Sequence, residues 1–403
     1  MNDKQPHVLM IGGRDFQMSC LPELRVSFIL FQLEDSINEF QKNVAAELVI
    51  IDYTAIEAAT QKALQIHAER PFDAVFSFTE FGLLPAASIA DTLKVATNCS
   101  LEAVLCTRNK LRMREMLVER DFKSIPYARV SSVEELAVFL EKYPRGIILK
   151  PIDGVGSQGV FLIKERSEIE AAFKHATKFG AQGLLAEEYV GGAEYSIESL
   201  SKSGRHEILA ITEKITSGAP HFVEFGHNQP AVLGASEQSL IHRATVSLIE
   251  QVGHQTGPCH SEVKLYEGQV YIIETQTRTG GDNIWDMTRI TTGADLYKET
   301  VAHVLGMETL PRRSTAATAA VRFFKPPAGK LARLHGVKEA ASLPGVHELV
   351  IKVKEGEQVK EAISSPTRAG YVVTTGPTLE SAIAVSRQVM DMVVFSVENG
   401  SEA

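Results

Sequence analysis

Several features that define other protein classes are missing from this 403-residue chain. No apolar run reaches the roughly 18 residues that a membrane-spanning helix needs, and the start, MNDKQPHVLMIGG, lacks the basic and long apolar segments of a secretory signal. The four cysteines are scattered, without the spacing of a disulfide framework or a zinc site. The formal net charge of −9 argues against non-specific nucleic-acid binding, which needs clustered Lys and Arg. We therefore expect a cytoplasmic protein with no membrane or nucleic-acid partner.

The composition is that of a large globular enzyme. With 44% hydrophobic and 23% charged residues over 403 positions, the chain has room for two or three domains. In the first hundred residues, β-rich runs at 7–11, 47–53 and 73–78 alternate with stretches of helical composition or period. This order predicts a small open parallel sheet, with functional residues after the carboxyl ends of its strands.

Two segments follow strands of this expected sheet. Gly12-Gly13 comes after the first strand, but the full Gly-x-Gly-x-x-Gly pattern of dinucleotide binding is absent, so we interpret the pair mainly as a tight turn. Glu80 follows the third strand. It is a candidate to meet a substrate ammonium, and the alternative is a charge at a helix N-terminus.

A glycine-rich loop near residue 155 has the composition of a phosphate clasp. In GIILKPIDGVGSQGVFLIK a buried-type strand delivers Lys150, and the loop DGVGSQGV then reverses into a second strand. Its glycines permit positive φ and close approach of backbone amides to phosphate oxygens. The pattern is not that of a Walker loop, which ends in Gly-Lys-Ser/Thr and opens a helix. A glycine-rich hairpin without a ligand is the alternative.

Two glutamates downstream form a candidate metal site. The segment CHSEVKLYEGQVYIIETQTR alternates apolar and polar residues on both sides of Glu267-Gly268, which predicts a β-hairpin. The pairing brings Glu262 and Glu274 to its polar face, where Mg²⁺ would relieve their repulsion. The alternative is a solvated strand face balanced by Lys264 and Arg278.

Taken in order along the chain, these pieces resemble the ATP-grasp superfamily over about residues 104–310. The resemblance implies phosphate contacts from Lys110 and Lys150; a lid formed by Gly154, Gly156, Ser157 and Gly159; adenine contacts from Glu187 and Val190; ribose contact from Glu194; and metal coordination by Glu262, Glu274 and Gln276. Gln276 departs from the asparagine that the family usually has at its position: the amide is retained, and its reach is longer by one methylene.

The resemblance also implies a fold and a chemistry. We expect a mixed α/β and α+β protein with an open parallel α/β domain (1–103), an ATP-grasp domain (104–310, lid subdomain about 125–190) and a small C-terminal α+β domain (311–403). The last region shows no catalytic cluster and predicts strands plus one helix. The implied cofactors are ATP and two Mg²⁺ ions, with Mn²⁺ as a substitute. ATP would activate a carboxylate as an acyl phosphate, and an amine would then displace phosphate.

A narrower resemblance is to the L-amino-acid ligase branch. In TEKITSGAPHFVEFGHNQPA, which we interpret as more loop than regular structure, Glu224 and His227 match the branch, as does TRTGGDN after the second metal acid. The resemblance implies that Glu224 meets an amino group, His227 stabilises charge on the activated carbonyl and Arg278 holds the phosphate side. Glu80, Gly280, Gly281 and Asp282 are further candidates for substrate binding. Asp282 stands where some dipeptide ligases have a bulky residue, so substrate preference does not carry over.

The predicted function is thus an ATP-dependent carboxylate–amine ligase of the C–N bond-forming type, acting on small molecules, mainly amino acids. One alternative keeps this chemistry but loads an amino acid onto a carrier protein or a small amine. Another is a non-catalytic ATP-binding protein of the same fold. A homodimer is a further expectation by analogy.

Overall fold

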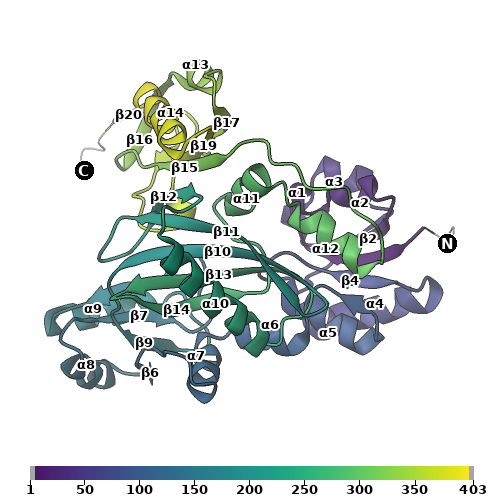
Figure 1. The fold of residues 1–403 in the computed structure, drawn as a ribbon, viewed down its shortest axis with the longest axis horizontal. Helices are drawn as coiled ribbons and strands as arrows, with labels where there is room; N and C mark the ends of the chain where they lie inside the picture. The colour runs from purple at the N-terminus through teal and green to yellow at the C-terminus, as the bar shows by residue number, and fades with distance from the viewer. Residues whose placement is uncertain (1–4, 399–403) are drawn as a thin grey trace.

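A five-stranded parallel sheet opens the chain in the computed structural model, which describes residues 5–398 (Figure 1). In spatial order its strands are β3 (Glu47–Ile50), β2 (Ser27–Gln32), β1 (His7–Ile11), β4 (Ala74–Phe76) and β5 (Ala96–Thr97). One face packs on α4 (Ile56–Glu69), α5 (Leu83–Leu93) and α6 (Leu101–Thr107). The other face packs on α1 (Asp15–Met18), α2 (Cys20–Glu23), α3 (Glu39–Val44) and α12 (Leu296–Val304). The open parallel sheet is confirmed.

Two strands of this sheet were not predicted, β2 and the two-residue β5. The run SFILFQ at 27–32 was taken as part of a helical stretch, and that interpretation is wrong, because it forms β2 beside β1. All but its first residue are buried. A parallel strand covered on both faces is apolar throughout, so it lacks the alternation by which a half-exposed strand is recognised.

A second, smaller sheet lies within the segment predicted to be the lid subdomain. Its antiparallel strands lie in the order β6 (Tyr127–Val130), β9 (Leu184–Glu188), β7 (Ile147–Pro151) and β8 (Phe161–Ile163). Helices α8 (Val133–Lys142) and α9 (Ile169–Ala176) pack on it through a separate apolar cluster. The predicted strand, glycine loop and returning strand around Lys150 are confirmed by β7 and β8.

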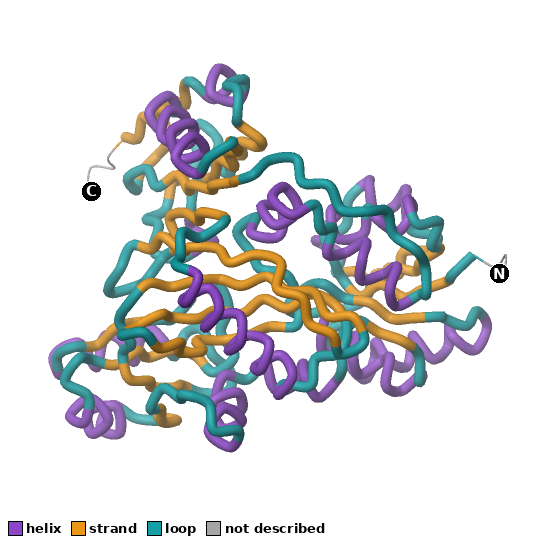
Figure 2. Tube along the Cα trace, viewed as in Figure 1, coloured by secondary structure: helices purple, strands orange, loops and turns teal. Residues whose placement is uncertain are grey.

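The largest sheet has eight strands, which extend from the middle of the molecule into the lobe near the C-terminus (Figure 2). In order they are β14 (Gln269–Gln276), β13 (Gly257–Tyr266), β10 (Ala193–Lys202), β11 (Arg205–Thr216), β12 (Glu224–Gln229), β15 (Thr318–Phe324), β19 (Gly370–Gly376) and β17 (Val346–Ile351). Helices α7 (Lys110–Glu119) and α10 (Ala235–Gln251) pack on its central strands, and α11 (Ile284–Thr292) packs near β15. The predicted hairpin is confirmed as β13 and β14.

The segment 212–231 was predicted to be mainly loop, and this is wrong. Residues up to Thr216 belong to β11 and residues from Glu224 to Gln229 belong to β12, with only 217–223 between them. Both strands lie inside the sheet, where backbone pairing on either side outweighs the low strand propensity of Gly226 and Asn228 in β12.

The C-terminal region shares the large sheet. Strand β12 pairs with β15, so the sheet continues across the predicted boundary at residue 310. The rest of the region is a small sheet of β18 (Gln358–Val359), β16 (Gly329–His335) and β20 (Val394–Glu398), with helices α13 (Val337–Ala341) and α14 (Leu379–Met392). It has two helices where one was predicted. The domain limits themselves stay predictions.

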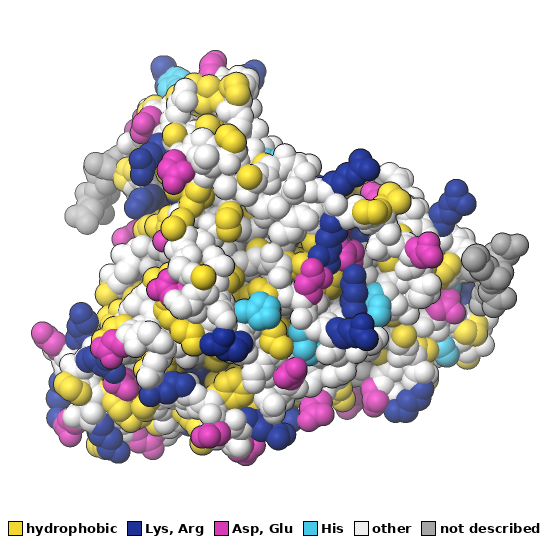
Figure 3. All heavy atoms as spheres, viewed as in Figure 1, with side chains coloured by type: hydrophobic (Ala, Val, Ile, Leu, Met, Phe, Trp, Pro, Cys, Tyr) yellow, Lys and Arg dark blue, Asp and Glu magenta, His cyan; other side chains and the backbone are white. Residues whose placement is uncertain are grey.

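The structure can be compared with two expectations from the composition, on membrane-spanning helices and on the distribution of charge. No helix within residues 5–398 is long and apolar enough to cross a bilayer. On the face drawn in Figure 3, acidic and basic side chains are interspersed.

Candidate functional site

One face of the large sheet carries most of the polar site. Glu262 on β13 lies directly opposite Glu274 on β14, and His260 lies opposite Gln276. The intervening residues of these strands point to the other face, where Val263 packs beneath α10. The alternation of the sequence thus sorts carboxylates to one side of the sheet and the apolar core to the other.

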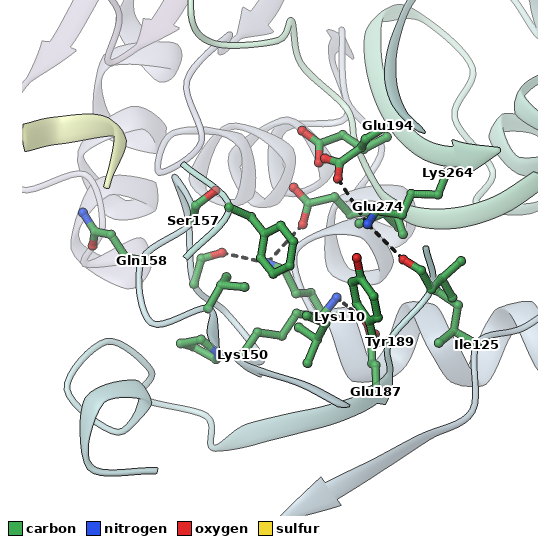
Figure 4. Close-up of a pocket in the computed structure, with 18 of the residues that line it drawn as sticks. Lys110, Ile125, Lys150, Ser157, Gln158, Glu187, Tyr189, Glu194, Lys264 and Glu274 are labelled. Carbon is green, nitrogen blue, oxygen red and sulfur yellow. Dashed lines mark hydrogen bonds and ion pairs between the residues drawn. The ribbon is translucent and has the colours of Figure 1, made fainter. Parts of the chain in front are cut away.

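A cavity with an empty volume of about 870 Å³ lies between this polar face and the lid sheet (Figure 4). The predicted residues that line it are Lys110, Lys150, Gly154, Gly156, Ser157, Glu187, Val190, Glu194, Glu224, Glu262 and Glu274. Gly159, Gln276, His227, Arg278, Glu80, Gly280, Gly281 and Asp282 lie outside its lining. The structure therefore brings most of the predicted nucleotide and metal residues together and leaves most predicted substrate residues outside this cavity.

Lys150 is fixed beneath the cavity by a buried ion cluster. The Lys150 Nζ lies 2.7 Å from one Glu187 oxygen, and the Arg114 Nε lies 2.6 Å from the other. Burial opposes ionisation of Glu187, but Arg114 and Lys150 lower its pKa to about 2. Arg114 also donates to the carbonyls of Ile272 and Ile273 at 2.7 and 2.8 Å. The Glu187 carboxylate is therefore occupied by Lys150. Any contact with adenine near Glu187 and Val190 would be made by backbone groups.

Lys110 connects the glycine loop to Glu274, one of the two candidate metal-binding glutamates. The Lys110 Nζ donates to the Gly154 carbonyl at 2.7 Å and lies 3.3 Å from Glu274 Oε2. Gly156 has φ +62° and a Cβ there would meet no heavy atom within 4 Å, so its backbone faces open space in the cavity. Ser157 donates to Glu224 Oε1 at 3.2 Å, which ties the loop to β12.

Glu262 and Glu274 fit a divalent cation by their placement. Their hydrogen bonds and ion pairs within residues 5–398 leave Glu262 Oε2 without a partner, since Lys214 and His260 both contact Oε1. Burial would raise the pKa of Glu262, but Lys214 and His260 hold it well below its usual range. The structure shows no group of three or more metal-ligating side chains in the part that it describes. Mg²⁺ at nucleotide sites is typically bound by one or two carboxylates, and phosphate oxygens and water complete its coordination shell.

Gln276 lies beside this pair and contacts one of its members. Its Nε2 donates to Glu274 Oε1 at 3.1 Å. An amide that donates to a metal acid orients that acid, and its own carbonyl oxygen remains a candidate ligand. Coordination by Gln276 stays a prediction.

Lys214 on β11 is a buried member of the site that the sequence did not reveal. Its ammonium lies 2.6 Å from Glu194, 2.9 Å from Glu262 and 3.6 Å from Glu224. Burial alone would lower the pKa of Lys214, yet these three carboxylates raise it well above the usual value. The positive charge of Lys214 therefore holds three candidate site residues close together: Glu194 for ribose, Glu262 for metal and Glu224 for a substrate amino group.

A β-bulge explains how Glu224 and His227 share a face despite their spacing of three. Thr216 pairs with Glu224 and Ile215 with Gly226, so Phe225 is the extra residue. The bulge changes the side-chain alternation by one position. His227 then pairs with Lys214 and lies on the same face as Glu224.

His227 belongs to a second group, which includes an arginine from the C-terminal region. Its Nε2 lies 3.5 Å from Asp282 Oδ2, and Arg368 binds both Asp282 oxygens. Arg368 is 3% exposed and its guanidinium lies 3.6 Å from the centre of the Phe323 ring. Burial would raise the pKa of Asp282, but His227 and Arg368 hold it well below its usual range. The last region, in which the sequence showed no catalytic cluster, thus contributes Arg368 to this group.

Glu80 and Arg278 contact each other. The Arg278 Nε lies 2.6 Å from Glu80 Oε2, and Arg108 lies on the other Glu80 oxygen at 3.7 Å. Burial opposes ionisation of Glu80, but Arg278 and Arg108 keep its pKa below the usual value. Glu80 therefore anchors Arg278 to the N-terminal sheet, and its predicted contact with a substrate ammonium stays a prediction.

Three of these residues had weak signals in the sequence. Arg114 lies one helical turn from Lys110, but nothing near it in the sequence marks its partner. Lys214 would have followed from period two had TEKIT been recognised as a strand. Arg368 is a single charge far along the chain, with no local pattern to mark it.

Two family models match parts of the chain. Residues 142–286 match the ATP-grasp domain, and residues 322–398 match the L-amino acid ligase C-terminal domain 2.

Curated relatives cover the chain to different extents. The uncharacterized protein y4rH of Sinorhizobium fredii is 22% identical over 97% of this chain and 82% of its own length. The alanine–anticapsin ligase of Bacillus subtilis is 26% identical over 60% of this chain, and the match spans 55% of that ligase. The chain thus matches only about half the length of this named ligase.

Solved structures establish the fold over nearly the whole chain. The L-amino acid ligase from Bacillus licheniformis matches with a TM-score of 0.83 at 21% identity, over 99% of this chain and 100% of that one. The biotin carboxylase domain of the Hydrogenobacter thermophilus 2-oxoglutarate carboxylase, solved with MgADP and bicarbonate, matches with a TM-score of 0.74 at 17% identity over 98% and 91% of the two chains.

Proposed function

We propose that this chain, an ATP-grasp protein with the L-amino acid ligase C-terminal domain 2, is an ATP-dependent ligase that joins a carboxylate to an amine. The carboxylate would be activated as an acyl phosphate, and the products would be an amide, ADP and phosphate. The observation that carries this proposal is one cavity in which Lys110, Lys150 and a glycine loop face the opposed carboxylates of Glu262 and Glu274.

The residues of the cavity suit phosphoryl transfer. Such a reaction needs the negative charge of the moving phosphoryl group neutralised and the reactants aligned, with little covalent chemistry from the protein. Lys150 is rigid because Glu187 and Arg114 hold it. Lys110 links the glycine loop to Glu274, so closure of the loop and position of the metal acid change together.

Glu262 and Glu274 would hold the cations. We propose two Mg²⁺ ions, for which Mn²⁺ could substitute, with Gln276 as a further ligand. Bound there, the cations would supply positive charge at the phosphate oxygens. ATP would lie with its ribose at Glu194 and its adenine at the backbone near Val190, both in the cavity lining.

The substrates are proposed to be amino acids. Glu224 lies at the edge of the cavity where an amino group would find a carboxylate, and His227 and Arg278 lie beyond it. His227 would stabilise charge on the activated carbonyl, and Arg278, with its planar fork, would hold the acyl phosphate. The names of the alanine–anticapsin ligase and the L-amino acid ligase support amino acids as the class. Gly280, Gly281 and Asp282 would line the same region.

Incubation of the purified protein with ATP, Mg²⁺ and pools of amino acids tests this function. We expect ADP and phosphate, together with a product whose mass is the sum of two amino acids less one water. AMP and pyrophosphate would exclude acyl-phosphate chemistry. ATP turnover with no new amide would point to a carrier protein or another amine as acceptor, and nucleotide binding without turnover to a non-catalytic protein.

Glu274→Gln provides the control. The variant keeps the shape of the side chain and loses its charge, so we expect turnover to fall by at least about 100-fold while the circular dichroism spectrum is unchanged. Unaltered turnover would refute the metal assignment. A cytoplasmic location and a homodimer stay predictions.

A further inference from the structure

A fully buried glutamate lies behind the metal acids, outside the cavity. Glu198 on β10 has 0% of its surface exposed and lies directly opposite His260 on β13. Its Oε1 lies 2.5 Å from the Nδ1 of His260. A carboxylate in so dry a place is costly unless it is paired, and His260 supplies that pairing.

His260 connects Glu198 to the metal acid. Its other ring nitrogen, Nε2, lies 3.2 Å from Glu262 Oε1. Because each nitrogen faces a carboxylate oxygen, each is placed to donate a hydrogen. The order across the sheet is therefore buried carboxylate, imidazole, metal acid.

These contacts determine which oxygen Glu262 presents. Lys214 at 2.9 Å and His260 at 3.2 Å both lie on Oε1. Oε2 is the oxygen left for a cation, and rotation of the carboxylate would break both contacts. A metal ligand oriented by such outer partners typically loses about 10- to 100-fold in metal affinity when they are removed.

The same support reaches the turn that follows Arg278. The backbone N–H of Gly280 donates to both oxygens of Glu198 at 3.2 Å. A Cβ at Gly280 would lie 2.6 Å from Glu198 Oε1 and 2.6 Å from His260 Nδ1. Close packing against this pair therefore favours glycine at Gly280, in addition to its proposed place beside the substrate.

We propose that Glu198, His260 and Gly280 are positioning residues that hold Glu262 in the orientation in which it binds its cation. This inference rests on the proposed function, because it takes Glu262 as a metal acid. These contacts also connect Glu262 to the turn after Arg278, so that a displacement of the turn would alter the orientation of the Glu262 carboxylate.

Binding of ADP to the full chain, titrated against Mg²⁺ and measured by calorimetry, tests the proposal without turnover. His260→Asn keeps a donor near the Nδ1 position and loses the one at Nε2, whereas His260→Gln can keep a donor toward Glu262. We expect the Mg²⁺ concentration for half-maximal ADP binding to rise about tenfold or more in His260→Asn and clearly less in His260→Gln. Rescue of this kind would not follow from a purely structural role.

Gly280→Ala disturbs the same support without removing a charge. We expect a rise in the Mg²⁺ midpoint similar to that of His260→Asn. Gly234→Ala is the matched control, because its Cβ would meet only Glu237 Oε2, at 3.5 Å. It should match the wild type.

The outcomes are distinct. If His260→Asn and Gly280→Ala fold and keep the wild-type Mg²⁺ midpoint within about twofold, the positioning role is refuted while the metal site stands. If His260→Asn does not fold, the comparison of Gly280→Ala with Gly234→Ala decides. If the wild-type chain binds ADP with no dependence on Mg²⁺, the metal assignment fails and the inference fails with it.

Discussion

Replacing Lys214 by methionine is expected to destabilise the protein strongly in the absence of metal. The substitution keeps most of the side-chain volume and removes the ammonium that lies 2.6 Å from Glu194 and 2.9 Å from Glu262. The buried carboxylates would then repel each other without a cation between them. Removal of one partner from a buried ion pair typically costs about 3–5 kcal/mol. For a cooperative unit of about 150–250 residues this corresponds to a fall in Tm of roughly 10 °C.

Mg²⁺ should reverse part of this loss. A cation bound by Glu262 would replace one of the contacts that Lys214 made, but it would not replace the contacts to Glu194 and Glu224. We therefore expect saturating Mg²⁺ to raise the Tm of Lys214→Met more than that of the wild type and to recover roughly half of the deficit.

Thermal unfolding followed by circular dichroism, with and without Mg²⁺, measures both effects. Lys264→Met is the matched control, since Lys264 also lines the cavity but lies 3.9 Å from its nearest carboxylate oxygen, on Glu194. It should lower Tm by only a few degrees, with no greater response to Mg²⁺ than the wild type. A Lys214→Met variant as stable as Lys264→Met, or one indifferent to Mg²⁺, would refute the reasoning.

Three further predictions test other parts of the site. Glu187→Gln removes the charge that holds Lys150, and isothermal titration should show ADP affinity reduced about tenfold; an unchanged affinity would contradict the role of the cluster. Arg368→Ala releases Asp282 but lies outside the nucleotide cavity, so amide synthesis should fall roughly 100-fold while MgADP affinity stays within about twofold, and parallel losses in both would argue against a separate substrate group. Burial lowers the pKa of His254 from 6.5 to about 4, so between these pH values His254 is protonated in the unfolded chain and neutral in the folded chain. Stability should therefore decline by about 3 kcal/mol as pH falls from 6.5 to 4, and the slope should flatten in His254→Gln, as denaturant melts at each pH would show.

The sequence predicted those parts of the site that have local patterns. The Glu262 and Glu274 pair was accessible because both residues lie at similar distances from the hairpin turn, although a β-bulge between Glu262 and Val263, which leaves Ile273 unpaired, sets their register. Lys150 and the glycine loop could also be predicted, because they lie within about ten residues of each other along the chain and form one local strand–loop–strand pattern. The parallel sheet followed from the order of its strands, although β2 was missed because it is apolar on both faces, and β5 because it has only two residues.

The remainder depends on contacts between distant segments. Lys214 and Glu194 meet because β10 and β11 pair, and the bulge at Phe225 decides the face of Glu224. Arg368 lies 86 residues from Asp282 along the chain. No spacing rule links such positions, so their pairing requires the folded structure.

The strand pairing between β12 and β15 has a practical consequence for dividing this protein. A chain shortened after residue 310 would keep the nucleotide cavity but lose the partner of Gly226, His227, Asn228 and Gln229. These residues would become a bare edge of the sheet, with backbone groups free to pair with another molecule. Such a fragment should self-associate, and the C-terminal region is better regarded as part of the same folding unit than as an appendage.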